Sequence, residues 1–222
     1  MKIRTFISGE YTFPVYHHYR NLKARVPQIL GDAFQVVRQT EHYETLEYWD
    51  YQGVDVVVLS TDEWVPKSGT QVQQAQAMLH YVAMGGGLVF MHNLDLGGDV
   101  EMAQMLGGRL RTQLWGRPQD DEPVLMRYEP VEHPISRGIQ PFEALDNRHQ
   151  IHFDNLTPRQ VFLNARLPDG LTVPAGWAVE FGLGRAVFLG PGHSDSAMDN
   201  PQYARLLRNS ARWAAGREVD NS

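Results

Sequence analysis

Cysteine is absent from all 222 residues of the chain. Its absence excludes disulfide bridges, metal sites built on thiolates and a cysteine nucleophile. Basic residues are also few, with 20 Lys and Arg against 26 Asp and Glu and a net charge of −6. The sequence has no basic run that would neutralise a phosphate backbone, so nucleic acid is not an expected partner.

Long apolar runs are missing as well. No stretch approaches the roughly 18 apolar residues that are needed to span a bilayer. The first residues, "MKIRTFISGEYTF", have too short an apolar region for a signal peptide, because Glu10 ends it. We therefore expect a soluble cytoplasmic protein with no membrane partner.

Hydrophobic residues make up 42% of the sequence, which is enough for a substantial core. Short runs rich in Val, Ile, Leu and Phe predict strands buried on both faces, at 2–8, 34–40, 54–60 and 86–92. Helical patterns separate them, over 70–84 and from about His18 to Leu30, where Pro27 predicts a kink or a late start. This alternation predicts a parallel sheet with helices on both sides.

The second half of the chain departs from this alternation. Further strands without helices between them predict antiparallel additions at one edge of the sheet, at 124–130, 150–154, 161–167 and 176–181. A tight turn at Leu183-Gly184 leads into a strand that returns to the sheet, and a last helix runs from Asn200-Pro201 to Gly216. We expect one domain over 1–216 and a frayed tail over 217–222.

Histidines mark several ends of these elements. His92 ends the fourth strand, His193 follows the strand over 185–190, and His18 opens the first helix. The carboxyl ends of parallel strands meet at one edge of a sheet, so we expect the three histidines in one pocket. Each histidine taken alone is explained more simply as a group that bonds a backbone carbonyl at a strand end.

Carboxylates follow the same strand ends, with Asp62 and Glu63 after the third strand and Asp195 after His193. Imidazole nitrogens and carboxylate oxygens are the usual ligands of Zn²⁺ where no thiolate is available. His18, His92 and His193 are therefore candidate ligands of a divalent metal such as Zn²⁺; otherwise no cofactor is expected. A cap on a loop explains Asp62 equally well.

Four segments resemble the ThuA-like (trehalose-utilisation) proteins, and the resemblance runs nearly end to end. They are "GGGLVFMHN" (85–93), "HPISRGIQPFEALDNRHQ" (133–150), "GLGRAVFLGPGH" (182–193) and "NPQYARLLRNSARWAAG" (200–216). The resemblance implies an α/β protein with the class I glutamine amidotransferase-like fold. This is a flavodoxin-like three-layer α/β/α sandwich, here with a mostly parallel sheet and antiparallel additions. It also implies a role in the catabolism of trehalose or a related glycoside or keto-sugar.

In class I amidotransferases the turn after the strand equivalent to 87–91 carries a cysteine nucleophile. This sequence has Met91-His92-Asn93 there, and without a thiol it cannot form a glutamyl thioester, so it is not a glutamine amidotransferase. By the same likeness we expect a helix N-terminus directly after His92, whose dipole would favour the neutral imidazole.

Family members usually carry an Asp-Glu-x-Tyr pattern after the residue equivalent to Phe142. This sequence reads Asp146-Asn147-Arg148-His149, which replaces the Glu by Asn147 and the Tyr by His149. The resemblance therefore leaves Asp146 to carry charge. His149 could transfer a proton, because an imidazole titrates near neutral pH.

Two classes of function remain open. The first is an enzyme, a hydrolase, lyase or isomerase acting on a sugar, with His92, His193, Asp146 and His149 as catalytic residues. Substrate contacts are expected from Asp62, Glu63, Trp64, Asn93, Trp115 and Asp195, and Trp177 could also stack on a sugar ring. The second class is a non-catalytic carbohydrate-binding or assembly protein. In either case the expected partners are a small carbohydrate and a second copy of the chain in a dimer.

Overall fold

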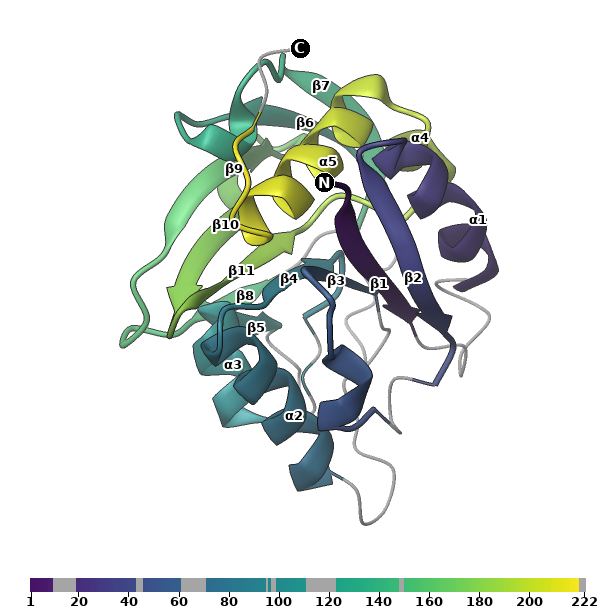
Figure 1. Ribbon diagram of the computed structural model, residues 1–222. Coiled ribbons are helices and arrows are strands. Elements are labelled where there is room, and N and C mark those ends of the chain that lie inside the picture. The colour runs from purple at the N-terminus through teal and green to yellow at the C-terminus, as the bar shows by residue number, and fades with distance from the viewer. Residues whose placement is uncertain are drawn as a thin grey trace.

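The computed structural model describes residues 1–9, 19–42, 46–60, 71–94, 96, 99–110, 123–147 and 150–219. A nine-stranded sheet runs through the molecule in the order β2-β1-β3-β4-β11-β10-β9-β6-β7 (Figure 1). The first five of these strands are parallel: β2 (Phe34–Thr40), β1 (Ile3–Gly9), β3 (Val56–Ser60), β4 (Gly87–Met91) and β11 (Gly184–Leu189). The parallel sheet predicted for the first half is therefore confirmed.

The other four strands are antiparallel additions at one edge: β10 (Thr172–Phe181), β9 (Gln160–Arg166), β6 (Val124–Pro130) and β7 (Phe142–Asp146). The first three were predicted, whereas β7 was not. The prediction was wrong for 150–154. That segment contributes β8 (Ile151–Phe153), which pairs with β5 (Gly108–Leu110) in a separate two-stranded sheet. A three-residue strand carries too little pattern in the sequence to specify its partner.

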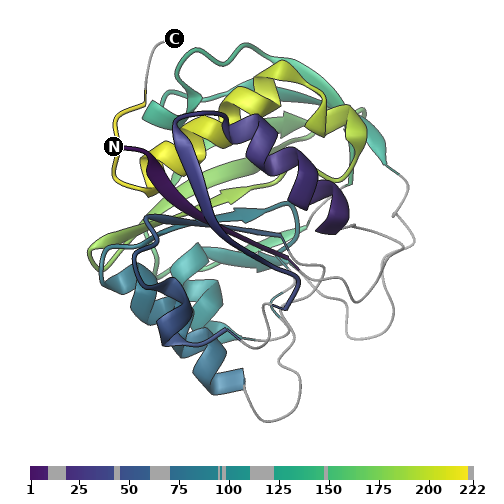
Figure 2. The same cartoon turned by 45° about the vertical axis from the view of Figure 1, so that its right-hand side comes forward.

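Helices cover both faces of the large sheet, which gives a three-layer α/β/α sandwich (Figure 2). One face carries α1 (Tyr19–Leu30), α4 (Asp195–Met198) and α5 (Pro201–Ala214). The other carries α2 (Gln71–Ala83) and α3 (Val100–Leu106), next to the short 3-10 helix η2 (Tyr48–Tyr51). A second 3-10 helix, η3 (Pro134–Ser136), lies beside α5.

The two cores follow from the alternation of side chains along buried strands. In β3, Val56 and Val58 pack into the core beneath α1 and α5, whereas Val57 and Leu59 pack into the core beneath α2 and α3. Successive side chains of a strand point to opposite faces, so a strand covered on both sides must be apolar throughout. All five residues of β3 are buried.

Pro27 lies inside α1 without delaying its start, which is at Tyr19, so a late start was the wrong expectation. Pro27 has no N–H to donate to the carbonyl of Lys23. The side-chain amide of Gln39 donates to that carbonyl instead, at 3.2 Å. The neighbouring strand thus replaces the hydrogen bond that the proline removes.

The last helix begins as predicted. The side chain of Asn200 caps α5 by accepting a hydrogen bond from the N–H of Gln202, and Pro201 occupies the first turn. Beyond α5 the chain packs at least as far as Val219, which is buried and whose carbonyl accepts a hydrogen bond from Arg137. This part of the segment expected to fray is therefore held against the domain.

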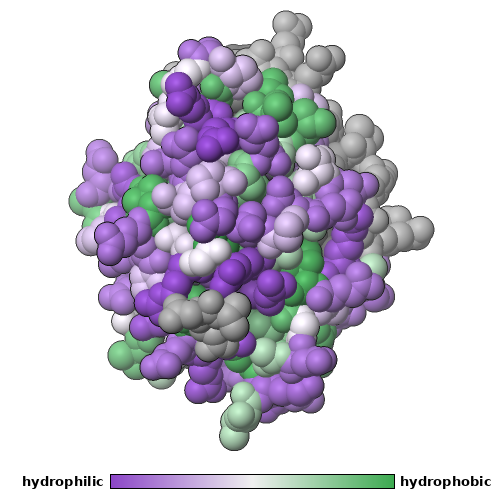
Figure 3. All heavy atoms as spheres, turned by 90° about the horizontal axis from the view of Figure 1, so that it is seen from above, coloured by the Kyte–Doolittle hydropathy of each residue, from purple (hydrophilic) through white to green (hydrophobic). Residues whose placement is uncertain are grey.

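The surface agrees with the composition. Seen from above, the coloured residues are mainly hydrophilic, and apolar side chains stand in small scattered groups (Figure 3). Within the described residues, no helix is both long and apolar enough to cross a membrane.

Candidate functional site

The turn after β4 holds His92 in a strained backbone conformation. Its φ is 63°, and among the described residues other than glycine no other φ is positive. The N–H of Asn93 donates to the carbonyl of Met91 at 2.8 Å, which closes a three-residue turn around His92. The form of this turn with a positive central φ is rare and strained. Such strain is concentrated at functional sites, where the surrounding structure maintains it.

Hydrogen bonds fix the proton positions on the His92 ring. Nδ1 lies 2.9 Å from the carbonyl oxygen of Gly190 and 3.4 Å from Oδ1 of Asp146. A carbonyl oxygen only accepts a hydrogen bond, so Nδ1 of His92 carries the proton. The contact of Nδ1 with Gly190 is shorter than its contact with Asp146. In the neutral ring Nε2 is then an acceptor. The side chain is 2% exposed.

His193 meets this acceptor. Its Nδ1 lies 3.2 Å from Nε2 of His92, and the two ring centroids are 5.1 Å apart. With His92 neutral, Nδ1 of His193 donates, so the lone pair of a neutral His193 ring is on Nε2. We call the chain of contacts from His193 through His92 to Asp146 the histidine relay. His193 is its half-buried member, and His92 and Asp146 are buried.

Asp146 reaches the relay from a distant strand. It ends β7, and three strands lie between β7 and β11 in the sheet. Register shifts around Gly176 in β10 interrupt the pairing with β9, and such irregularities bend a sheet. The segment after β11 also bonds along β7, where the Ser194 hydroxyl donates to the carbonyl of Leu145 at 2.6 Å. Together these features bring the carboxylate of Asp146 beside His92.

The Asp146 carboxylate is satisfied mainly by backbone donors. The N–H of Gly192 donates to Oδ2 and the N–H of Asn147 to Oδ1, both at 2.9 Å. Burial raises the pKa of this carboxyl to about 6. The two backbone bonds oppose this rise, as do a hydrogen bond from the Tyr128 hydroxyl and one from the backbone of His193.

Two buried tyrosines lie beside the relay, and the sequence analysis did not predict either as a site residue. Burial raises the pKa of both Tyr128 and Tyr203, with the Asp146 charge as a further cause, so both hydroxyls stay neutral. The Tyr203 hydroxyl is buried without a hydrogen-bond partner among the described residues, and it closely approaches Gly192. Their apolar periodicity assigns both residues to the core, so no signal in the sequence separates them from packing residues.

The other residues proposed from the sequence fall into two groups. Asn93 directly follows His92 and is half-buried, whereas Asp195 is 73% exposed and forms an ion pair with Arg25 at 2.8 Å, on the side of α1. The rest lie outside the described residues: His18, Asp62, Glu63, Trp64, Trp115 and His149. The described residues hold no group of three metal-binding side chains.

Two expectations about the site are corrected. No helix starts directly after His92, since α3 begins at Val100 with Asp99 as its cap, so its dipole does not act on the imidazole. Trp177 cannot stack on a sugar, because it is fully buried and its indole N–H donates to the carbonyl of Leu106 at 2.7 Å. Its position within β10, between two covered faces, explains the burial.

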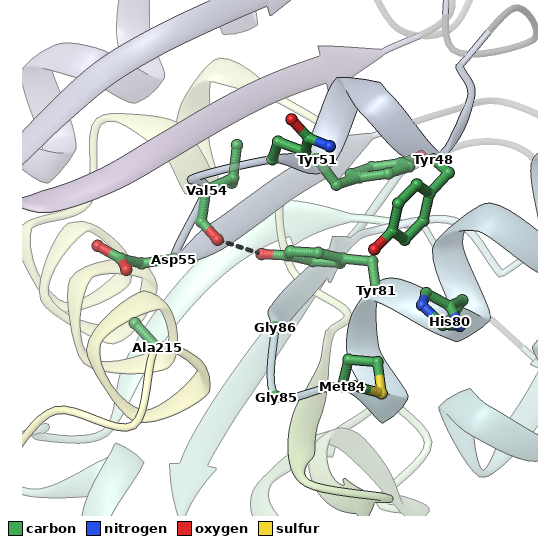
Figure 4. A pocket seen from close by; sticks show the side chains of 11 residues that line it. Tyr48, Tyr51, Val54, Asp55, His80, Tyr81, Met84, Gly85, Gly86 and Ala215 are labelled. Carbon is green, nitrogen blue, oxygen red and sulfur yellow. Dashed lines mark hydrogen bonds between the residues drawn. The ribbon is translucent and has the colours of Figure 1, made fainter.

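A separate hollow of about 290 Å³ opens at the opposite, amino-terminal ends of β3 and β4 (Figure 4). The stacked rings of Tyr51 and Tyr81 line it, and the Tyr81 hydroxyl donates to the carbonyls of Gly87 and Val54 at 3.2 and 3.4 Å. Functional groups of open α/β sheets gather at the carboxyl ends of the strands. We therefore place the candidate site at the histidine relay.

The fold and the site define a class. The molecule has the class I glutamine amidotransferase-like architecture that the resemblance implies, and the strained turn after β4 carries His92. The model of the ThuA family, described as trehalose utilisation, matches residues 14–214. The chain belongs to this family, which supports a carbohydrate-related role. Proteins of curated function give no match.

Solved structures agree with this fold. A ThuA-like protein of Parabacteroides merdae superposes with a TM-score of 0.76 at 19% identity, covering 100% of this chain and 93% of the other. A cytoplasmic protein of Salmonella typhimurium gives 0.65 at 16% identity, covering 95% and 98%. The β-galactosidase of Rahnella sp. R3 gives 0.66 at 14% identity, and there the likeness covers 96% of this chain but 31% of the enzyme.

Proposed function

We propose that the protein is an enzyme of carbohydrate catabolism in which the histidine relay moves a proton to and from a sugar. The observation that carries the proposal is the unbroken sequence of contacts from Nδ1 of His193 to Nε2 of His92, and from Nδ1 of His92 to Asp146. Proton transfer by a positioned imidazole is a step that hydrolases, lyases and isomerases share.

The relay supplies both a base and a way to spread charge. Nε2 of His193 takes a proton from a sugar hydroxyl or from a carbon next to a carbonyl group. The imidazolium that forms can pass its Nδ1 proton to Nε2 of His92, and the positive charge is then stabilised by Asp146. The strained turn fixes His92 in place, so the relay needs little reorganisation when the charge appears.

Deuterium exchange tests this proposal directly. The protein is incubated in D₂O with trehalose, simple glucosides and keto-sugars, and proton loss from each sugar is followed by NMR. We expect exchange or turnover of at least one sugar, and a loss of at least a hundredfold in His92→Ala and His193→Ala. His152→Ala, which removes an exposed histidine of β8, is the matched control. Full activity of His92→Ala would reject the relay.

A metal centre is the second candidate, and one distance favours it. Two nitrogen ligands of one tetrahedral Zn²⁺ lie about 3.3 Å apart, since each Zn–N bond is about 2.0–2.1 Å. The separation of 3.2 Å between the two imidazoles fits this spacing as well as it fits a hydrogen bond. His92 and His193 would then be ligands, with His18 as the proposed third. Elemental analysis of purified wild type and His193→Ala distinguishes a bound metal from the relay.

The non-catalytic alternative has support of its own. The same fold forms 31% of the Rahnella β-galactosidase chain, so it occurs within a larger carbohydrate enzyme. A protein with this function would bind a sugar without exchanging its protons, and His92→Ala would leave its affinity unchanged. Calorimetry on the same sugar panel tests both statements.

A further inference from the structure

A small apolar pocket lies directly beside the histidine relay. Its volume is about 120 Å³, and it is lined by residues of β6, β8, β9, β10 and β11, together with Asn147 and Gln150. Three of its lining residues also serve the relay. The carbonyl of Gly190 accepts from His92, the N–H of Asn147 donates to Asp146, and the Tyr128 hydroxyl bonds to Asp146.

The pocket has an apolar wall and an open end. Ala165 and Leu167 of the β9 region and Tyr128 of β6 are buried in its wall. Leu171, in the turn between β9 and β10, also lines the pocket although it is 58% exposed. An exposed leucine in the rim and a closed apolar interior indicate that the pocket opens to solvent at this turn.

One polar atom of a residue that lines the pocket has no partner. Oδ1 of Asn147 is buried and has no hydrogen-bond partner among the described residues. Buried acceptors in native proteins are nearly always satisfied, and leaving one unsatisfied is costly. A hydroxyl donor on a bound molecule would satisfy this atom, at a point next to the Asp146 end of the relay.

The volume limits what the pocket can hold. An apolar cavity of about 150 Å³ in another protein binds benzene, so about 120 Å³ accommodates a group of one six-membered ring or less. We propose that this pocket binds an apolar aglycone of the substrate, up to the size of a phenyl ring, while Asn147 accepts a hydrogen bond from an adjacent sugar hydroxyl. This inference rests on the proposed function and names its substrate class as glycosides with an apolar aglycone.

Binding of small probes tests the pocket without any need for turnover. Toluene and phenol are titrated into the protein by saturation-transfer NMR and calorimetry, and we expect both to bind to the wild type. Ala165→Leu should abolish the binding of toluene and of phenol, because the larger leucine side chain fills the pocket. Asn147→Ala should weaken phenol about fivefold and leave toluene unchanged, since it removes an acceptor for the hydroxyl. Leu183→Ala, which alters an exposed leucine at the opposite end of β10, should change neither.

Paired glycosides test the aglycone. Phenyl and methyl forms of α-D-glucoside, β-D-glucoside and β-D-galactoside are compared in wild type and Ala165→Leu. Each buried CH₂-sized group contributes a factor of about four in affinity, so at least one phenyl form should bind tenfold or more tightly than its methyl form. The preference should vanish in Ala165→Leu. Val173→Phe, a second filling variant from the partly buried lining, replaces it if thermal unfolding shows that Ala165→Leu does not fold.

Absence of toluene binding, absence of a phenyl preference in every pair, or a preference that survives both filling variants would each overturn this inference. An active relay without a phenyl preference rejects the pocket alone. Toluene binding with a phenyl preference, together with unchanged activity in His92→Ala, rejects the relay alone.

Discussion

Replacing Asp146 by asparagine should change how the stability of the protein depends on pH. The wild-type carboxyl is fully buried, and burial raises its pKa to about 6 from the ordinary value of 3.8. A group whose folded-state pKa is raised stabilises the fold below its unfolded pKa, and this contribution is lost as the pH rises through the folded pKa. The side-chain amide of the Asp146→Asn variant has no ionisable proton, so the variant does not lose this stability as the pH rises.

The magnitude follows from the shift in pKa. With pKa values of 3.8 unfolded and about 6 folded, ionisation of Asp146 costs about 2 kcal/mol of stability between pH 4 and pH 7. The variant also has a cost that does not vary with pH. Both carboxylate oxygens accept backbone N–H groups, and the amide of the variant must place an NH₂ group against one of these donors. The slope with pH, rather than the offset, is therefore diagnostic.

Urea unfolding of the wild type and Asp146→Asn at pH 4, 5, 6 and 7 measures both quantities. We expect the stability of the variant relative to the wild type to rise by about 2 kcal/mol across this range. Asp32→Asn, which removes an exposed carboxylate from the turn after α1, controls for the loss of one charge. A constant difference between wild type and Asp146→Asn would refute the raised pKa of Asp146.

Three further predictions concern the turn, the glycine beside it and assembly. His92→Gly should be about 1 kcal/mol more stable than His92→Ala in urea unfolding, because glycine adopts a φ of 63° without strain. Equal stabilities of the two variants would show that the backbone of this turn is not strained. Gly192→Ala should lose about 2 kcal/mol of stability and disturb the relay, since its Cβ would lie 2.9 Å from the Tyr203 hydroxyl oxygen. Gly170→Ala, also at positive φ but with no atom within 4 Å, should lose about 1 kcal/mol. A larger loss in Gly170→Ala than in Gly192→Ala would contradict the crowding at Gly192. We also expect a dimer by light scattering at high micromolar concentration, and a particle of about 25 kDa would reject it.

The parallel half of the fold was predictable because its strands are buried on both faces. Such strands leave continuous apolar runs in the sequence, and glycine or polar residues mark their ends. The segment 150–154 could not be assigned in the same way. β8 has three residues, and its pairing with β5 depends on where α3 places that strand rather than on a pattern of its own.

The parts of the candidate site that could be predicted followed from the position of residues in the sheet more than from their type. His92 and His193 follow adjacent parallel strands, so their meeting follows from the register of β4 with β11. The place of Asp146 beside them came only from the resemblance to the family, because a bend in the sheet and the hydrogen bond from Ser194 to Leu145 bring β7 back to β11. The ring of His92 is buried and bonded to Gly190, so His92→Ala should lose about 1–3 kcal/mol of stability as well as activity.

The histidine relay is tested most directly by the ring nitrogens themselves. Long-range ¹H–¹⁵N NMR of the protein at about pH 8, above the ordinary pKa of histidine, reports which nitrogen of each neutral imidazole carries the proton, and His92→Asn and His193→Asn assign the two signals. We predict that both rings carry the proton on Nδ1, since Nδ1 of His92 donates to Gly190 and Nδ1 of His193 donates to Nε2 of His92. A proton on Nε2 of His92 in the neutral ring would contradict the relay.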